Sequence, residues 1–209
     1  MKPTTDASVA DILAAYDKAA DTLTQRLETL STATVLRPVA GFLPASPSRV
    51  LDVGAGTGRD AAWFAGQGHQ VWAAEPVDSL REAAQSLHGS SAITWINDGL
   101  PDLARCTALG IGFDLVLLNA VWHHVPPALR PASLSALASL VGSGGRLIMS
   151  LREGPSDPAR PAFLADVDRT VAEAEALGLR LARRSWVEAV QPENRRSGVI
   201  FTWLVFLRE

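Results

Sequence analysis

Three glycines alternate with other residues in the stretch 54–58 (Gly-Ala-Gly-Thr-Gly), which directly follows a short apolar run containing Asp52. Glycines let a backbone turn tightly and let a ligand approach it closely. A dinucleotide-binding loop needs Gly-x-Gly-x-x-Gly, but Arg59 stands at the sixth position here, and no P-loop pattern is present. The Asp52 carboxylate would repel a pyrophosphate and would suit a cation. The loop therefore favours a cationic ligand that carries an amino group and a sulfonium.

Further polar side chains follow the next strand-like segments. Glu75 directly follows the run 70–74, about 20 residues past the glycine loop. A carboxylate at this position can accept hydrogen bonds from ribose hydroxyls. Asp98 follows a third segment, and Asn119 follows the apolar run 113–118. Open α/β sheets bind ligands at the carboxyl ends of their strands, so these side chains are candidates to line one site.

His123 and His124 lie close to Asn119 in the sequence. An unperturbed imidazole pKa of about 6.5 suits a general base at neutral pH, although such a histidine can equally pack or bind backbone. Adjacent side chains are expected to point in different directions, so at most one should face a substrate. Two adjacent histidines without a third spaced ligand predict no metal site. Trp122 beside them is a candidate for either the pocket wall or the core.

The elements that must position these residues alternate along the chain. Strand-like segments are expected at 48–53, 70–74, 92–96, 113–118 and 146–151, and helices at 61–66, 79–87 and 131–141. This alternation predicts an α/β domain with a mostly parallel sheet. Residues 7–30 have helical spacing, and a helix at 163–177 precedes two further strands, 180–190 and 199–208. A turn at 191–194 links this last pair closely, which favours an antiparallel arrangement.

Composition narrows the class of protein. The chain has 209 residues, which is one domain by the usual prior of about 100–200 residues per domain. A net charge of −3 without a dense Lys/Arg cluster argues against nucleic acid as a partner. Cys106 is the single cysteine, which fits a reducing compartment, and no apolar run reaches the roughly 18 residues of a membrane span. We expect a cytoplasmic protein without membrane association.

The stretch 52–58 resembles motif I of the class I S-adenosylmethionine-dependent methyltransferases, Asp/Glu-x-Gly-x-Gly-x-Gly, and matches it in full. The resemblance extends from about residue 48 to 209, and the stretch 58–63 is similar to a small-molecule branch that includes tellurite-resistance proteins. It implies a doubly wound, Rossmann-like sheet of seven strands in the order 3-2-1-4-5-7-6. The seventh, C-terminal strand would be antiparallel, with helices on both faces and an N-terminal helical lid.

The same resemblance implies S-adenosylmethionine as cofactor and S-adenosylhomocysteine as product. Glu75 would bind the ribose, and Asp98 would lie near the adenine amino group. The implied cofactor-binding set is Asp52, Gly54, Ala55, Gly56, Gly58, Glu75, Pro76, Asp98, Gly99 and Asn119. The stretch 119–122 (Asn-Ala-Val-Trp) departs from the Asp/Asn-Pro-Pro-Tyr/Phe motif of amino-directed DNA methyltransferases, which disfavours that substrate class.

Tyr16 lies in a segment that loosely resembles the one preceding motif I in small-molecule methyltransferases. The resemblance implies that residues 7–30 act as a lid over cofactor and substrate, with Tyr16 and Trp122 as candidate substrate residues. The alternative is an amphipathic helix packed on the edge of the sheet. We expect a single methyltransferase domain over 1–209, with residues 1–47 as an N-terminal helical cap and 48–209 as the Rossmann-like core.

These features together predict an enzyme of the EC 2.1.1 class that methylates oxygen, nitrogen or sulfur of a small molecule. The acceptor and the oligomeric state stay open at this point. Arg152 and Arg195 flank the expected pocket mouth, where either could hold an anionic group or be solvated. The alternatives are a non-catalytic S-adenosylmethionine-binding or protein-partner module of the same fold and, against the glycine spacing, a nicotinamide oxidoreductase.

Overall fold

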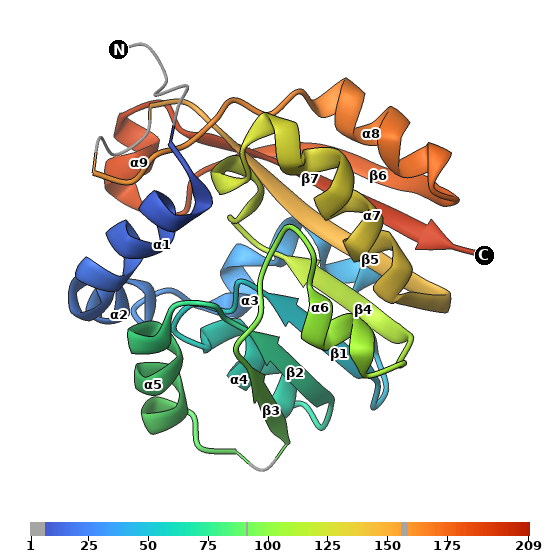
Figure 1. Cartoon of the computed structure of the whole chain (residues 1–209), viewed down its shortest axis with the longest axis horizontal. Coiled ribbons are helices and arrows are strands. Elements are labelled where there is room, and N and C mark those ends of the chain that lie inside the picture. The colour runs from blue at the N-terminus through green and yellow to red at the C-terminus, as the bar shows by residue number, and fades with distance from the viewer. Residues whose placement is uncertain (1–6, 91, 156–158) are drawn as a thin grey trace.

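The computed structural model describes residues 7–90, 92–155 and 159–209, and a seven-stranded sheet forms its centre (Figure 1). Its strands are β1 (Arg49–Val53), β2 (Gln70–Ala74), β3 (Ile93–Ile96), β4 (Phe113–Leu118), β5 (Val141–Glu153), β6 (Leu179–Glu188) and β7 (Ile200–Arg208). The strand order is β3-β2-β1-β4-β5-β7-β6. All pairs among the first five strands are parallel, whereas β7 is antiparallel to both β5 and β6. The predicted fold class and strand order are confirmed.

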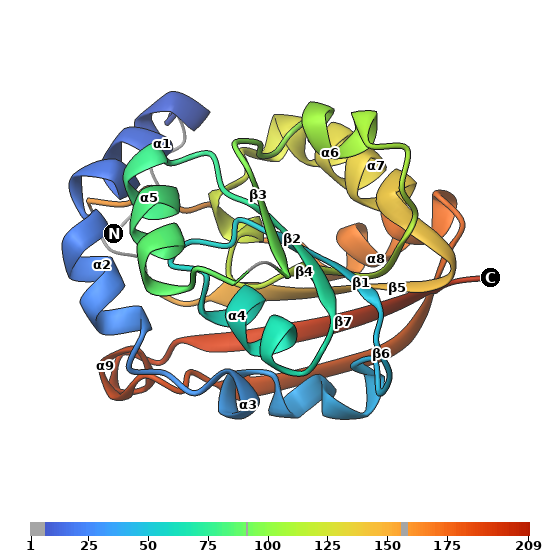
Figure 2. The ribbon, with the colours of Figure 1, turned by 90° about the horizontal axis from the view of Figure 1, so that it is seen from below.

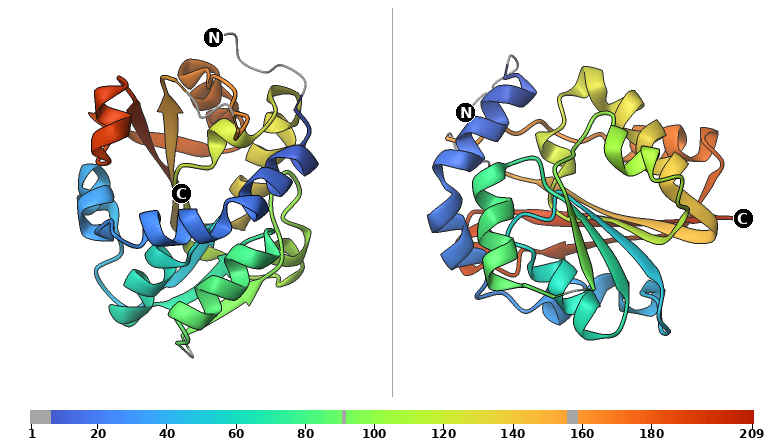
Figure 3. Two further views of the ribbon diagram at one scale, coloured as in Figure 1. Left: turned by 90° about the vertical axis from the view of Figure 1, so that its left-hand side faces the viewer. Right: turned by 60° about the horizontal axis from the view of Figure 1, so that its bottom comes forward.

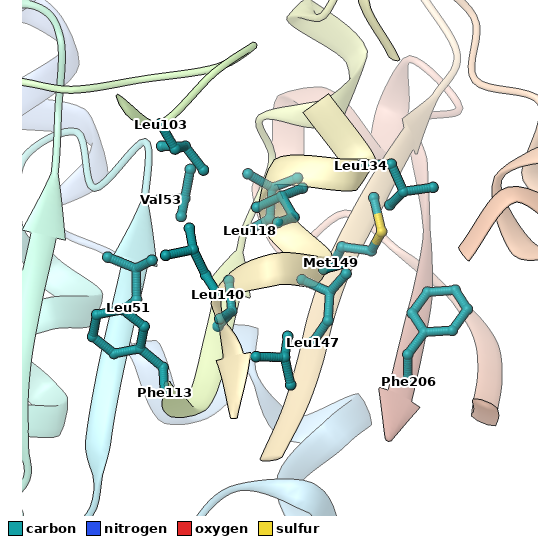
Figure 4. Close-up of a cluster of buried hydrophobic side chains, with 14 of the residues drawn as sticks. Leu51, Val53, Leu103, Phe113, Leu118, Leu134, Leu140, Leu147, Met149 and Phe206 are labelled. Atoms are coloured by element: carbon teal, nitrogen blue, oxygen red, sulfur yellow. The ribbon is translucent and has the colours of Figure 1, made fainter. Parts of the chain in front are cut away.

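The central strand β4 shows why the chain forms this sheet. Leu115 and Leu117 belong to the core cluster on one face of the sheet, and Val116 and Leu118 belong to the cluster on the other. A strand that is buried on both faces must be apolar at successive positions, as this one is. Figure 4 shows Leu118 within the larger of the two clusters.

Helices cover both faces of the sheet (Figure 2). The α-helices are α1 (Val9–Lys18), α2 (Ala20–Leu27), α3 (Thr32–Val35), α4 (Arg59–Gly66), α5 (Asp78–Leu87), α6 (Ala104–Ala108), α7 (Arg130–Leu140), α8 (Val167–Ala176) and α9 (Pro192–Arg196). Three short 3-10 helices are η1 (Arg37–Phe42), η2 (Trp122–His124) and η3 (Pro127–Leu129). Leu103, Leu134 and Ala174 bring the segments of α6, α7 and α8 into one cluster, and Leu36 and Phe64 bring α3 and α4 into the other. In the described ranges no helix is long and apolar enough to cross a membrane.

The N-terminal helices α1 and α2 lie across one end of the sheet, beside α5 (Figure 3). Ser8 begins α1 with a capping box, in which its Oγ accepts the Asp11 N–H and the Asp11 carboxylate accepts the Ser8 N–H. Ala20 and Leu23 of α2 share a small apolar cluster with residues of the α5 segment. The helix pair expected within residues 7–30 is therefore present.

Two C-terminal boundaries differ from the expectation. The helix expected from residue 163 begins only at Val167, because the Asp166 side chain caps it by accepting the Arg169 N–H. The expected turn at 191–194 is instead the start of a short helix, α9. Proline is tolerated in the first helical turn because its missing N–H would have no intrahelical partner there, so Pro192 permits this helix.

Candidate active site

The glycine loop joins β1 to α4 at the carboxyl edge of the sheet. Its glycines 54, 56 and 58 all have positive φ values, of 69°, 57° and 81°. A Cβ atom on Gly54 would lie 2.5 Å from Val121 Cγ2, and one on Gly58 would lie 2.5 Å from the Trp95 ring. A Cβ on Gly56 would meet nothing closer than a backbone oxygen at 4.0 Å. Tight packing therefore explains two of the glycines, while Gly56 leaves backbone open to a ligand.

Two buried carboxylates stand at the ends of neighbouring strands. Asp52 of β1 is 2% exposed, and its Oδ2 has no hydrogen-bond partner among the described residues. Glu75, which follows β2, is 4% exposed and accepts the N–H groups of Gly56 at 2.7 Å and Val77 at 2.8 Å. Burial, with the Asp60 charge, raises the pKa of Asp52 well above its ordinary value, and burial also raises the pKa of Glu75. A buried cation would compensate both groups.

Asp60, in the first turn of α4, is a functional candidate that the sequence analysis did not single out. It is buried and pairs with the Arg59 guanidinium at 2.8 Å. Its carboxylate also accepts the Thr32 hydroxyl at 2.8 Å and the Asn119 amide N–H at 2.8 Å. We refer to Asp52, Asp60 and Glu75 as the acidic end of the site. An aspartate directly after the glycine loop was the available signal for Asp60.

Asn119, at the end of β4, forms hydrogen bonds through both polar atoms of its side-chain amide. Its Nδ2 donates to Asp60, and its Oδ1 accepts the Ser150 hydroxyl at 3.0 Å. The Ser150 Oγ in turn accepts the N–H of Ala120 at 2.8 Å. Ala120 has a φ of 58°, a left-handed conformation that costs a non-glycine residue free energy and that surrounding contacts must maintain. The β4 end is therefore a fixed, strained turn, as is common at functional sites.

Tyr16 of α1 reaches across to His124 of η2. The Tyr16 hydroxyl lies 2.6 Å from His124 Nε2, and His124 Nδ1 lies 2.7 Å from the Pro161 carbonyl oxygen. A carbonyl can only accept, so Nδ1 carries the hydrogen and Nε2 accepts the Tyr16 O–H. Burial raises the pKa of Tyr16 to about 12 and lowers the pKa of His124 to about 4, so both groups are neutral at pH 7. The pair joins the N-terminal helices to the carboxyl end of the sheet.

The two histidines do not diverge as expected. The 3-10 helix places the rings of His123 and His124 with centroids 4.0 Å apart, and both line the same cavity. His123 is 6% exposed, and its Nδ1 has no partner in the described part of the chain. Burial lowers the pKa of His123 well below its ordinary value. Both rings are therefore neutral at pH 7, as a base must be.

One cavity of about 540 Å³ collects most of the predicted residues. Its lining includes Asp52, Gly54, Ala55, Gly56, Glu75, Pro76, Asn119, His123, His124 and Tyr16. The volume lies in the range of small-molecule sites, about 300–1,000 Å³. Within the described ranges no cluster of three or more His, Cys, Asp or Glu side chains is arranged to hold a metal ion.

Four predicted residues lie outside this cavity. Gly58 packs against Trp95, as described above. The Asp98 carboxylate accepts the N–H groups of Gly99 at 2.9 Å and Cys106 at 2.8 Å, so it organises the loop after β3. Gly99 lies against Pro76, and a Cβ there would approach Pro76 Cγ to 3.0 Å. Trp122 is fully buried in the core and does not form the pocket wall, because η2 turns its ring inward beneath Arg130.

A doubly wound sheet with a glycine loop and acidic strand ends defines an α/β protein that binds its ligand at the carboxyl edge of the strands. The family model described as "Methyltransferase domain" matches residues 23–191. The chain belongs to this methyltransferase family, which confirms the resemblance seen in motif I.

Curated relatives match about half of the chain. An uncharacterized methyltransferase of Mycobacterium tuberculosis is 32% identical over 119 residues, which cover 54% of this chain and 58% of that protein. A protein-L-isoaspartate O-methyltransferase of Anaeromyxobacter dehalogenans is 29% identical over 122 residues, covering 52% of this chain and 49% of that one. The chain thus spans about half the length of the curated relatives that it matches.

Solved structures share the fold over nearly the whole chain. The 1,6-didemethyltoxoflavin-N1-methyltransferase of Burkholderia thailandensis, with 1,6-didemethyltoxoflavin and S-adenosylhomocysteine bound, has a TM-score of 0.70 at 20% identity and covers 99% of this chain and 93% of its own. A TehB-like SAM-dependent methyltransferase from Corynebacterium glutamicum has a TM-score of 0.65 at 20% identity, with coverages of 92% and 99%. These likenesses establish the shared fold.

Proposed function

We propose that the protein transfers a methyl group from S-adenosylmethionine to oxygen, nitrogen or sulfur of a small molecule. The observation that carries this proposal is the acidic end, where the carboxylates of Asp52 and Glu75 are buried beside open glycine-loop backbone. Membership of the methyltransferase family and a bounded cavity of about 540 Å³ support it. The formal net charge of −3 supports a small-molecule acceptor over a nucleic acid, and the single cysteine supports a cytoplasmic location.

The residues of the acidic end fit a cofactor with a positive charge. The unpartnered Asp52 Oδ2 can accept a hydrogen bond from an amino group, which would remove the cost of leaving that buried atom unsatisfied. Glu75 uses one lone pair of each oxygen for backbone N–H groups, so each oxygen keeps acceptor capacity for a ribose hydroxyl. We assign cofactor contacts to Asp52, Gly54, Ala55, Gly56, Glu75, Pro76 and Asn119. Gly58, Asp98 and Gly99 would act by shaping the two loops.

Bound S-adenosylmethionine supplies a methyl group that its positive sulfur already activates. The task of the chain is then to hold the acceptor in line and to exclude water, which can contribute about 7–11 kcal/mol in favourable cases. The hydrogen bonds of the Asn119 side chain and of the Ala120 N–H fix the shape of the cavity at the end of β4. His123 and His124 are the candidate bases; the Nε2 lone pair of His124 accepts the Tyr16 hydroxyl, so a substrate proton would reach it only through that hydroxyl or by displacing it. Their lowered pKa values make them weak bases, so positioning is the larger contribution.

Residues 7–30 would act as a lid within a single methyltransferase domain, with residues 1–47 as the cap and 48–209 as the core. Apolar side chains of α1 and α2 line the cavity, including Ile12 and Leu23. Glu28, directly after α2, accepts the Thr57 hydroxyl at 2.5 Å. This contact ties the lid to the glycine loop, and the Tyr16–His124 bond ties it to β4.

Calorimetric titration of S-adenosylmethionine into the purified protein tests the proposed function. We expect saturable binding, and we expect Glu75→Gln to weaken it tenfold or more, about 1.4 kcal/mol. Glu175→Gln, at an exposed position of α8, is the matched control and should bind like the wild type, and NAD should not bind. Absence of S-adenosylmethionine binding to the wild type would overturn the proposal. Binding without any methyl transfer across a broad acceptor panel would instead favour a non-catalytic module.

A further inference from the structure

Three arginines line the cavity away from the acidic end, and they come from three separate parts of the chain. Arg26 lies on α2, Arg152 lies near the end of β5, and Arg160 lies in the loop before α8. The Arg160 guanidinium stands 5.7 Å from the centre of the Tyr16 ring. Arg26 and Arg160 are both close enough to Arg152 to lower its pKa, in addition to the effect of burial. We refer to these three residues as the basic end of the cavity.

The partners of Arg26 and Arg152 in the described part of the chain are neutral. Arg26 donates to the Gln191 side-chain oxygen at 3.0 Å, and Arg152 donates to the carbonyls of Gly154 and Pro155. Neither forms an ion pair with a carboxylate among the described residues. Like charges gathered in a partly buried site are unfavourable unless an anion joins them. Arg26 and Arg152 are therefore suited to share an oxyanion ligand.

The sheet register separates Arg152, in the basic end, from Asp52, in the acidic end. Asp52 pairs with Leu117 on β4, and Leu117 pairs with Ile148 on β5. Arg152 stands four residues beyond Ile148, so it lies roughly 13 Å further along the strands and roughly 10 Å across them from Asp52. One compact cationic group cannot span both ends. The cavity lining also includes apolar side chains from α1, α2 and the start of β7.

We propose that the methyl acceptor is a small molecule with an apolar body and one oxyanion group, a carboxylate or a phosphate, which Arg152 and its two neighbouring arginines bind. This inference rests on the proposed function. Arginine suits the role because its planar guanidinium can donate two parallel hydrogen bonds to one oxyanion. The acceptor's reacting atom would then lie toward Tyr16 and His124, between the basic end and the cofactor.

Paired probes that share an aromatic body, one member with an anionic group and one without, test this subsite. With the protein saturated with S-adenosylhomocysteine, melting temperatures are measured with benzoate against benzamide, indole-3-acetate against indole-3-acetamide, and phenyl phosphate against phenol. We expect at least one anionic probe to raise the melting temperature while its neutral partner does not, and the responding pair distinguishes carboxylate from phosphate. Arg152→Gln and Arg26→Gln should each weaken that probe, Arg152→Gln tenfold or more. Arg195→Gln, which lies outside the cavity lining, should not.

Two results would overturn the subsite. One is equal response to the charged and neutral members of every pair. The other is a loss of S-adenosylhomocysteine affinity in Arg152→Gln as large as the loss of probe affinity, because the arginines would then bind the cofactor's own carboxylate. Failure of the proposed function is distinguishable from both, since the wild type would then bind no S-adenosylhomocysteine before any probe is added.

Discussion

The acidic and basic ends of the cavity differ in construction as well as in charge. Asp52 and Glu75 stand at the ends of adjacent core strands, and backbone N–H groups hold Glu75 in place. Arg26, Arg152 and Arg160 come from a helix, an extended strand end and a loop; Arg26 is exposed, and Arg152 and Arg160 are half-buried. A rigid acidic end fits a ligand common to a whole family, whereas a composite basic end fits a ligand that varies among its members.

The largest expected effect comes from breaking the rigid end. In Gly54→Val the new Cβ would collide with Val121, and the residue would keep a positive φ that valine disfavours. Strain and overpacking of this kind together cost about 2–5 kcal/mol. We expect a lower melting temperature and no measurable S-adenosylmethionine binding. Gly41→Ala, where a Cβ meets nothing within 4 Å, is the control; equal behaviour of the two variants would show that the loop geometry is not essential.

Asp52→Asn tests the charge of the acidic end without changing its shape. S-adenosylmethionine affinity should fall tenfold or more, about 1.4 kcal/mol. Burial raises the folded-state pKa of Asp52 above its ordinary value of 3.8, so the stability that this carboxyl contributes is complete below about pH 4 and is lost as pH rises through the folded-state pKa. Urea unfolding from pH 4 upward should therefore show less loss of stability in the variant. An unchanged pH profile would contradict the assigned burial of this charge.

Tyr16→Phe should have the smallest effect, because it removes a single hydrogen bond, the one between α1 and η2. The loss of the bond to His124 costs about 0.5–1.5 kcal/mol. We expect faster dissociation of S-adenosylmethionine in stopped-flow measurements, since the lid is then held less firmly. Burial lowers the folded-state pKa of His124 to about 4 from its ordinary value of 6.5, so its contribution to stability is complete above pH 6.5 and is lost as pH falls toward 4. An unchanged dissociation rate would argue against a lid.

The difference between the acidic and basic ends also explains which features of the site could be predicted from the sequence. The alternation of strands and helices and the acidic strand ends follow from local patterns, in which an apolar run, a glycine loop and an acid stand next to each other in the chain, whereas the strand order is implied by the resemblance of motif I. Arg152 is a candidate from the sequence, but its grouping with Arg26 and Arg160 could not be predicted, because Arg26 and Arg160 are 134 positions apart and only the fold brings them together. The core position of Trp122 and the shared direction of His123 and His124 depend on a 3-10 turn that short apolar patterns do not specify.

The division of the cavity into two charged ends is tested most directly by a crossed titration. The affinities of S-adenosylmethionine and of the anionic probe that raises the melting temperature most are measured by calorimetry for the wild type, Asp52→Asn and Arg152→Gln, with the cofactor site saturated by S-adenosylhomocysteine during the probe titrations. The account predicts that Asp52→Asn weakens only S-adenosylmethionine and that Arg152→Gln weakens only the anionic probe, each tenfold or more. If both variants weaken the same ligand, or if neither distinguishes the two, the two-ended cavity is wrong.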